Sequence, residues 1–279
     1  MDHRCLQCFE KSFTRLMHKY PLNPGQEIMF AEYFEKQMEN MDTMSTPEIQ
    51  RNLTQRLKEF IGVHDLYTDE KRESNEQALA LYDEWAPKVK ASDDPYILAL
   101  RLAIAGNIMD YGANINFDVN ATIETVLKAD FAIDHSEMLR NALNNAQKIL
   151  YLGDNAGEIV FDRLFIEQFG KKVIFAVKSG PVLNDVTYED ARVTGMDDVA
   201  EIIENGFDAP STILHKCSRE FRKVYDEADL IISKGQGNFE GLIYEKDPRL
   251  FFLLMVKCVV IADHIDAPKN SFIVYNPVG

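Results

Sequence analysis

The sequence predicts an α/β protein, a three-layer α/β/α sandwich with a mostly parallel, Rossmann-like sheet and an N-terminal helical region. Three features predict this fold. Apolar residues three and four apart dominate before about residue 147, short apolar runs alternate with helical patterns after it, and glycine-rich polar turns follow those runs. Apolar strands separated by helices are typical of a parallel sheet that is covered on both faces.

Residues 1–146 are expected to form a mostly helical region that packs on the rest of the chain. Helical spacing of apolar residues is clearest in residues 49–61, 75–85 and 96–109. An aspartate ahead of Pro95 is a plausible N-cap for the last of these stretches. Such helices need a partner for their apolar faces, and the second half of the chain would supply it.

Residues 147–279 are expected to form the α/β core that binds metal and phosphate. Its strands are expected at residues 148–152, 172–177, 229–233, 259–262 and 272–275. Helical patterns lie between them, from about 153 to 169, 196 to 205 and 218 to 228. This alternation of strand and helix is the pattern on which the predicted parallel sheet depends.

The chain is acidic, with 30 Lys and Arg residues against 45 Asp and Glu residues and a formal net charge of −15. Such a surface repels nucleic acid and anionic membranes, so neither is expected as a partner. A phosphate-bearing ligand would therefore have to be held locally, by a metal ion or by a few lysines. No apolar run reaches the roughly 18 residues of a membrane span, and the N-terminus does not resemble a signal peptide. We expect a cytoplasmic protein; the oligomeric state is left open.

Polar residues follow three of the expected strands, in the motifs GDNAGE, KSGPVLND and SKGQGN. Ligands of open parallel sheets bind outside the carboxyl ends of the strands, which makes these residues candidates for a site. Asp154 and Asn155 of the first motif and Asp185 of the second offer only oxygen ligands, which suit Mg²⁺ or Mn²⁺. The competing interpretation is that Asp154 and Asn155 cap the helix that follows.

Several residues near these motifs suit phosphate. Gly157 stands at a helix N-terminus, where amide groups and the helix dipole favour an anion, although neither a Rossmann fingerprint nor a P-loop is present. Lys234 ends the third strand, where its ammonium could neutralise a phosphoryl oxygen. Lys257 lies in an apolar run, so it is either compensated in the interior or reaches out to water.

Two further groups allow a functional and a structural interpretation. Asn107 and Asp110 are three residues apart and share one helical face, which would point into the cleft unless the helix simply ends there. Cys5 and Cys8 form one C-x-x-C, which is half of a zinc site only if His215 and Cys217 complete it. Without that second half, they are small core residues.

Taken together, the motifs resemble the metal-dependent damage-control phosphatase family, formerly a family of unknown function. The resemblance rests on AGNIMDYGA, YLGDNAGE, KSGPVLNDVT, SKGQGNFEGL and the segment around Lys257, and it covers most of the chain. Cys5 and Cys8 are typical of the prokaryotic branch. Better-studied branches carry R-T-x-K where this chain has LMVK, so only Lys257 matches that motif.

The resemblance implies one divalent ion, Mn²⁺, Mg²⁺, Co²⁺ or Ni²⁺, held by Asp154, Asn155 and Asp185. It also implies contacts to phosphate or substrate from three further residues, Lys234, Asn238 and Lys257. The substrates would be small phosphomonoesters, such as sugar phosphates or damaged phospho-metabolites. In-line displacement at phosphorus would follow, by water or by a carboxylate.

Two other functions are weighed against the phosphatase. A carboxyl methyltransferase that uses S-adenosylmethionine also has a layered α/β fold, and residues 153–157 partly fit its glycine-rich loop, but Asp185 lies far past the second strand. A non-catalytic metabolite-binding protein is the third possibility. Metal-stimulated release of phosphate without binding of S-adenosylmethionine would favour the phosphatase.

Overall fold

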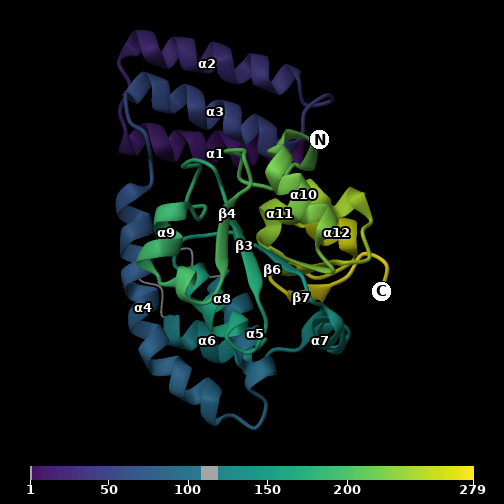
Figure 1. Cartoon of the computed structure of the whole chain (residues 1–279). Helices are drawn as coiled ribbons and strands as arrows, with labels where there is room; N and C mark the ends of the chain where they lie inside the picture. Colours follow the sequence, from purple (N-terminus) through teal and green to yellow (C-terminus); the bar gives the residue numbers. More distant parts are fainter. Residues whose placement is uncertain (1, 108–118) are drawn as a thin grey trace.

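The computed structural model describes residues 2–107 and 119–279. At its centre, these residues form a seven-stranded sheet with the order β1-β7-β6-β5-β2-β3-β4 (Figure 1). The strands are β1 Phe131–Asp134, β2 Ile149–Leu152, β3 Val173–Val177, β4 Glu201–Glu204, β5 Leu230–Lys234, β6 Leu250–Met255 and β7 Phe272–Tyr275. Neighbouring strands are parallel except β6 and β7, which are antiparallel. The predicted mostly parallel sheet is confirmed.

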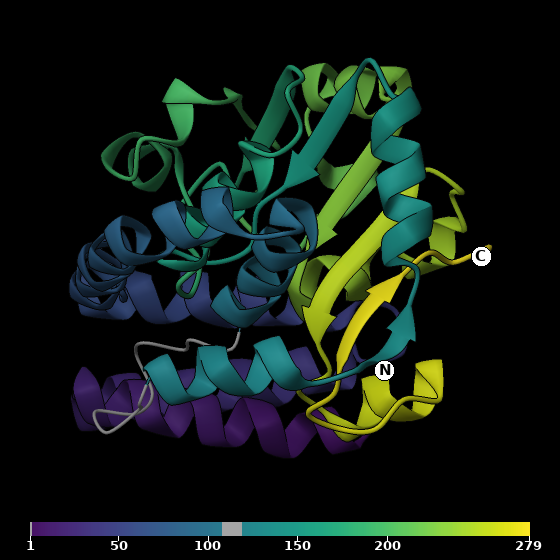
Figure 2. The same ribbon diagram turned by 90° about the horizontal axis from the view of Figure 1, so that it is seen from below.

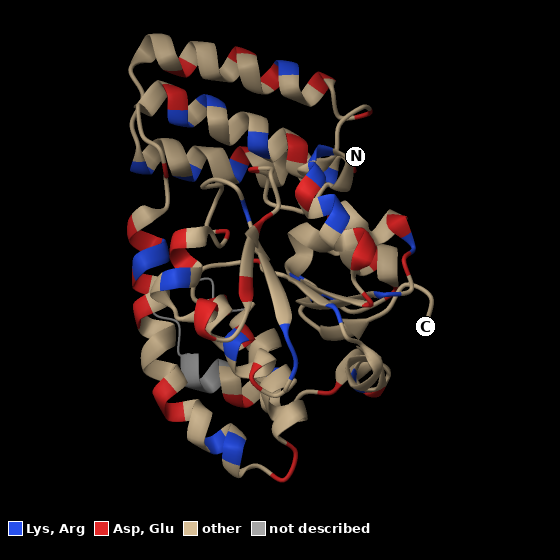
Figure 3. Cartoon of the chain, in the orientation of Figure 1, with Lys and Arg blue, Asp and Glu red and all other residues tan. Residues whose placement is uncertain are grey.

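Helices surround this sheet. They are α1 Arg4–Lys19, α2 Pro24–Glu39, α3 Thr46–Ile61, α4 Thr68–Ala91, α5 Pro95–Gly106, α6 Val119–Lys128, α7 Ser136–Asn145, α8 Glu158–Ile166, α9 Tyr188–Val193, α10 Arg219–Glu227, α11 Gly235–Leu242 and α12 Val259–Ile265, with 3₁₀ turns η1 Met196–Asp198, η2 Leu214–Lys216 and η3 Ile243–Glu245. Among the described residues, no helix combines the length and the apolar character needed to cross a bilayer. Charged residues are spread over the outer helices and loops, and the strands contain few of them (Figure 3).

The alternation of side chains along the strands separates two cores. Tyr151 of β2 packs with the helices α4 to α8 on one face, whereas its neighbours Leu150 and Leu152 pack with α10, α11 and α12 on the other. This period of two is what a strand covered on both faces requires. Figure 2 shows the sheet between its helical layers. The three-layer sandwich therefore follows from continuously apolar strands.

The helices α1, α2 and α3 form a separate layer with its own apolar core, seen at the top of Figure 1. Local sequence explains their ends. Asn23 and Ser45 begin α2 and α3 with reciprocal capping boxes, each followed by a proline in the first turn. Gly62 ends α3 in the left-handed conformation. Asp94 caps α5, as the sequence predicts, by accepting a hydrogen bond from the N–H of Ile97 at 3.1 Å.

Two predicted elements are wrong. Residues 259–262 belong to the helix α12. The buried strand in this part of the chain is β6, which consists of the more strongly apolar segment LFFLLM. Val259 is 44% exposed, which does not suit a central strand. Residues 196–205 form η1 and the edge strand β4, whose two glutamates face solvent and give the segment a false helical spacing.

The sheet also takes a strand from the half that is predicted to be helical. Strand β1 precedes residue 147 and pairs with β7, and α7 follows β1 directly. The boundary at residue 147 between a helical region and an α/β core stays a prediction, and β1 lies on the N-terminal side of it. The remaining predicted strands and the helix at about 218–228 correspond to β2, β3, β5, β7 and α10.

Candidate active site

The segments that follow β2 and β3 lie side by side at the carboxyl edge of the sheet. Asn155 and Asp185 form an isolated antiparallel bridge. The N–H of Val186 donates to the carbonyl of Asp154 at 2.8 Å, and the N–H of Ala156 donates to the carbonyl of Asn184 at 2.9 Å. The three predicted metal ligands are therefore brought together from two neighbouring strand ends.

Asp154 is held by two carboxamides. Nδ2 of Asn107 and Nδ2 of Asn155 donate to its Oδ2 at 2.9 and 2.7 Å, and both also donate to Oε2 of Glu158 at 3.0 Å. Asp154 is 8% exposed, and its burial together with the charge of Glu158 raises its pKa to about 6. Asn107 thus reaches the site as predicted, whereas its predicted companion Asp110 lies outside the described residues.

Asp185 is the least satisfied group of the site. It is 3% exposed, and its Oδ2 is buried without a hydrogen-bond partner among the described residues. The nearest cation is Nζ of Lys178, at 3.6 Å. Burial raises the pKa of Asp185 well above its usual range, Lys178 lowers it, and the carboxylate of Asp154 raises it further.

The pair of Asp154 and Asp185 fits a divalent cation. Burial and the carboxylate of Asp154 both raise the pKa of Asp185, a positive charge between the two carboxylates would relieve this, and Oδ2 of Asp185 has an unused acceptor. With the side-chain oxygen of Asn155, the donor set is oxygen only, as Mg²⁺ and Mn²⁺ prefer. Nδ2 of Asn155 donates to Asp154, which leaves its Oδ1 for a ligand.

Lys178 is a residue that the sequence interpretation missed. It is 2% exposed, and its Nζ donates to Oδ1 of Asn238 at 2.9 Å while facing Asp185. Asn238 in turn donates to the carbonyls of Gly153 and Lys234 at 3.1 and 2.9 Å. The available signal was its position as the first residue after β3, where a lysine ends an apolar strand in the same way as Lys234.

Lys234 contacts protein groups, whereas the sequence predicts that it contacts a phosphate. It is fully buried, and its Nζ donates to Oε1 of Glu158 at 2.6 Å, to Oδ1 of Asp162 at 2.5 Å and to the carbonyl of Ala103 at 2.8 Å. An ammonium has three N–H groups, so all are used. Tyr151 donates to the same oxygen of Asp162 at 2.7 Å, and burial raises the pKa of Asp162 to about 7. This geometry suits a positioning role, and a phosphate contact by Lys234 stays a prediction.

Glycines let the backbone approach Asp154 and the first turn of α8. Gly235 begins α11 with φ +77°, and a Cβ there would overlap the carboxylate of Asp154. Gly157 has φ +76°, and its N–H donates to Oδ1 of Asn75 at 2.7 Å. That amide is therefore satisfied by α4 in this structure, and an anion contact by Gly157 also stays a prediction.

Lys257 follows β6 and is half-buried. Its positive charge lowers the pKa of Asp154, and its N–H donates to Oε1 of Gln236 at 3.1 Å. A pocket of about 740 Å³ between α4 and α9 reaches Lys178 and Asn75. This pocket ends at Lys178, which lies beside Asp185, and Asp154, Asn155 and Asp185 do not line it.

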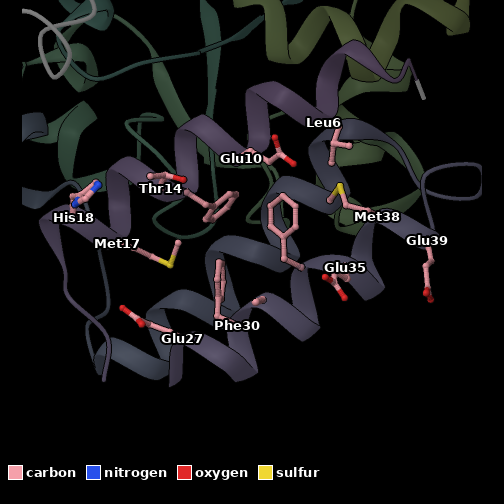
Figure 4. A pocket seen from close by; sticks show the side chains of 13 residues that line it. Leu6, Glu10, Thr14, Met17, His18, Glu27, Phe30, Glu35, Met38 and Glu39 are labelled. Carbon is pink, nitrogen blue, oxygen red and sulfur yellow. The ribbon is translucent and has the colours of Figure 1, made fainter. Parts of the chain in front are cut away.

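Two other cavities lack this chemistry. A groove of about 910 Å³ between α1 and α2 is lined by apolar side chains such as Met17, Phe30 and Met38 (Figure 4). It carries four glutamates and neither lysine nor arginine, so it does not suit phosphate.

Cys5 lines a second pocket, of about 490 Å³, together with Cys258. The predicted partners His215 and Cys217 do not line that pocket. Across the described part of the chain, no three or more His, Cys, Asp or Glu side chains are grouped as a metal site.

Known proteins are similar to this chain over most of its length. The damage-control phosphatase ARMT1-like domain matches residues 1–272. The chain belongs to this family. A protein named damage-control phosphatase from Pyrococcus horikoshii is 36% identical over 222 residues, which are 78% of this chain and 76% of that protein. The chain is accordingly a phosphatase, as the resemblance implies.

Two further similarities agree with this assignment. An uncharacterized protein from Methanocaldococcus jannaschii is 38% identical over 220 residues, 75% of this chain and 72% of that protein. The crystal structure of a DUF89 family protein from Pyrococcus horikoshii superposes with a TM-score of 0.89 at 30% identity and covers 99% of each chain. The α/β fold described above is therefore the fold of a solved family member.

Proposed function

We propose that this phosphatase is a metal-dependent phosphomonoester hydrolase whose catalytic residues are Asp154, Asn155 and Asp185. One observation carries the proposal: two buried carboxylates from neighbouring strand ends lie together, and Oδ2 of Asp185 has no hydrogen-bond partner among the described residues. A buried carboxylate oxygen without a partner destabilises the folded protein unless a cation binds it. A phosphatase needs positive charge at the same place.

The contacts of each side chain suggest its role. Asp154, Asn155 and Asp185 would hold one divalent ion, with Mn²⁺, Mg²⁺, Co²⁺ and Ni²⁺ as candidates. When bound, such an ion offsets the charge that develops on the phosphoryl oxygens. The amides of Asn107 and Asn155 fix the Asp154 carboxylate, because each bridges it to Glu158.

Lysines supply further positive charge. Lys178 and Lys257 would neutralise phosphoryl oxygens, since Lys178 faces Asp185 at 3.6 Å and Lys257 lowers the pKa of Asp154. Lys234 acts as a positioning residue, because it anchors Glu158, which shares two amides with Asp154. Asn238 orients Lys178.

The proposed substrates are small phosphomonoesters, such as sugar phosphates or damaged phospho-metabolites. The relatives named damage-control phosphatase support this class, and the 740 Å³ pocket has the size of a metabolite site. The acidic chain and its buried lysines favour a small ligand over a polynucleotide. A methyltransferase is not favoured, because relatives of this chain are named damage-control phosphatases.

The test is release of p-nitrophenol from p-nitrophenyl phosphate, after chelation and with each of the four metals added back. The wild type should be active only with metal, and Asp154→Asn should lose at least about a hundredfold in kcat/KM. Lys178→Met should lose about ten- to a hundredfold, because it removes one charge beside the phosphoryl oxygens. The exposed Asp69→Asn is the matched control and should stay at the wild-type rate.

Full activity of Asp154→Asn, or activity of the wild type that survives chelation, would refute the proposal. Titration with S-adenosylmethionine in the same buffer should give no heat of binding.

A further inference from the structure

Lys58 of α3 is a buried lysine whose charge is not paired. It is 8% exposed, and its Nζ donates to the carbonyl of Pro181 at 3.2 Å. The described part of the chain buries three other lysines, and each of them has a carboxylate within 4 Å: Lys71 pairs with Asp190 at 2.7 Å, Lys178 with Asp185 at 3.6 Å and Lys234 with Glu158 at 2.6 Å. No such ion pair forms at Lys58 within the described residues.

The carboxylates nearest to Lys58 already have partners. Asp208 accepts hydrogen bonds from Arg51 and Gln55. Asp65 accepts from the N–H of Tyr67 at 2.8 Å and faces Lys71 at 3.5 Å. A buried ammonium without a counter-ion is costly, so this position is one where an external anion would be stabilised.

The electrostatic surroundings agree with this interpretation. Burial lowers the pKa of Lys58, and this effect outweighs the raising effect of Asp208 and Asp65, while Arg51 lowers the pKa further. A bound anion would raise the pKa of Lys58 again and favour the charged ammonium.

Lys58 also lines a cavity. The pocket has a volume of about 690 Å³ and lies between α3, residues 62–64, residues 179–181 and residues 206–208. Glu59, also in its wall, is paired with Arg56 at 2.8 Å, which leaves the charge of Lys58 uncompensated there. A volume of this size accommodates a small metabolite.

The pocket adjoins the approach to the candidate active site. His64 and residues 179–181 line both this pocket and the 740 Å³ pocket that reaches Lys178. The loop after β3 starts with Lys178, which lies beside Asp185. In the same loop, the carbonyl of Pro181 accepts a hydrogen bond from Lys58. An anion at Lys58 and a phosphoryl group at Asp185 would lie on the same loop.

We propose that Lys58 and the loop of residues 179–181 bind an anionic group, a carboxylate or a phosphate, of a small metabolite. The anion belongs either to the substrate, as a second charged group away from the phosphoryl group, or to a separate metabolite. Only the first source rests on the proposed phosphatase site.

Calorimetric titration with sulfate, in metal-free buffer of low ionic strength, tests the proposal without reference to activity. Lys58→Met should raise the dissociation constant of one sulfate at least about tenfold, because it keeps the length of the side chain and removes its charge. Lys58→Arg should stay within about threefold, since it keeps the charge. Lys36→Met, on the exposed face of α2, should bind like the wild type.

Sulfate binding by Lys58→Met that equals the wild type would overturn the proposal, and Lys58 would then merely reach water in the pocket. Thermal unfolding of each variant, followed by circular dichroism, identifies a variant that fails to fold. In that event Lys58→Gln takes the place of Lys58→Met.

Two arms distinguish the sources of the anion. If it belongs to the substrate, Lys58→Met raises KM for 3-phosphoglycerate more than for glycerol 3-phosphate, which has a hydroxymethyl group in place of the carboxylate. If it belongs to a separate metabolite, the ratio of the two KM values is unchanged and sulfate alters the rate on p-nitrophenyl phosphate in the wild type only. A wild type without metal-dependent phosphatase activity would refute the proposed function and leave the sulfate result standing.

Discussion

Two buried ionic clusters lie next to each other at the carboxyl edge of the sheet, and they differ in how well their charges are satisfied. In the first, Lys234 uses all three N–H groups, and both oxygens of Glu158 accept hydrogen bonds. In the second, Asp185 has a buried oxygen without a partner, and its nearest cation is 3.6 Å away. The first cluster is complete in its ion pairs, with only Oδ2 of Asp162 left without a hydrogen-bond partner among the described residues, whereas the second lacks a close cation, as the proposed metal site requires.

The two clusters are connected through amides. Asn107 and Asn155 each donate to Glu158 of the complete cluster and to Asp154 of the incomplete one. The complete cluster thereby fixes the geometry of the incomplete one. This arrangement, a rigid support beside groups left unsatisfied for a ligand, is typical of binding sites.

The largest expected effect is on stability and comes from the complete cluster. Lys234→Met should lower the free energy of unfolding by about 3–5 kcal/mol, because two carboxylates are left buried without their cation. The matched control is Lys148→Met, whose pair with Glu227 is largely exposed and should contribute less than about 1 kcal/mol. Urea unfolding measures both, and equal losses in the two variants would contradict the distinction.

A substitution in the incomplete cluster should affect activity strongly and stability little. Asp185→Asn should lower kcat/KM at least about a hundredfold, because it removes a proposed metal ligand. Its free energy of unfolding, measured without metal, should stay within about 1 kcal/mol of the wild type, since a poorly satisfied buried charge is removed. A variant that keeps its activity and loses stability would place Asp185 with the structural residues.

The smallest expected effect is on metal affinity as a function of pH. The pKa of Asp154 is about 6, so the carboxyl group is ionised at pH 7 and mostly protonated at pH 5. Protons then compete with the metal, and the affinity for Mn²⁺ should fall about tenfold between pH 7 and pH 5. A carboxyl group with an ordinary pKa would give almost no change over this range. A constant affinity would show that burial does not raise the pKa of Asp154, and a steeper fall would show that Asp185 titrates as well.

Much of the fold could be predicted from the sequence because it depends on local patterns. The central strands β2, β3 and β5 are continuous apolar runs, and the sheet alternates them with helices. The edge strands were harder: β1 and β4 are four residues long and half-exposed, and β4 carries glutamates at both ends. Their assignment depends on pairing with distant strands, which single-sequence patterns do not contain.

The candidate site shows the same limit. That Asp154, Asn155 and Asp185 lie together could be predicted because strand ends of a parallel sheet meet at one edge. The sequence does not say where a lysine side chain points, so Lys234 was singled out as a phosphate contact and Lys178 was missed. Only the packing of α5 and α8 turns Lys234 into the interior and leaves Lys178 beside Asp185.

The most direct test of the proposed metal site is calorimetric titration of the metal-free protein with Mn²⁺ at pH 7, for the wild type and for Asp154→Asn. One ion should bind per chain in the wild type, and binding in the variant should be at least about a hundredfold weaker. Equal binding by the two proteins, or no binding by the wild type, would contradict it.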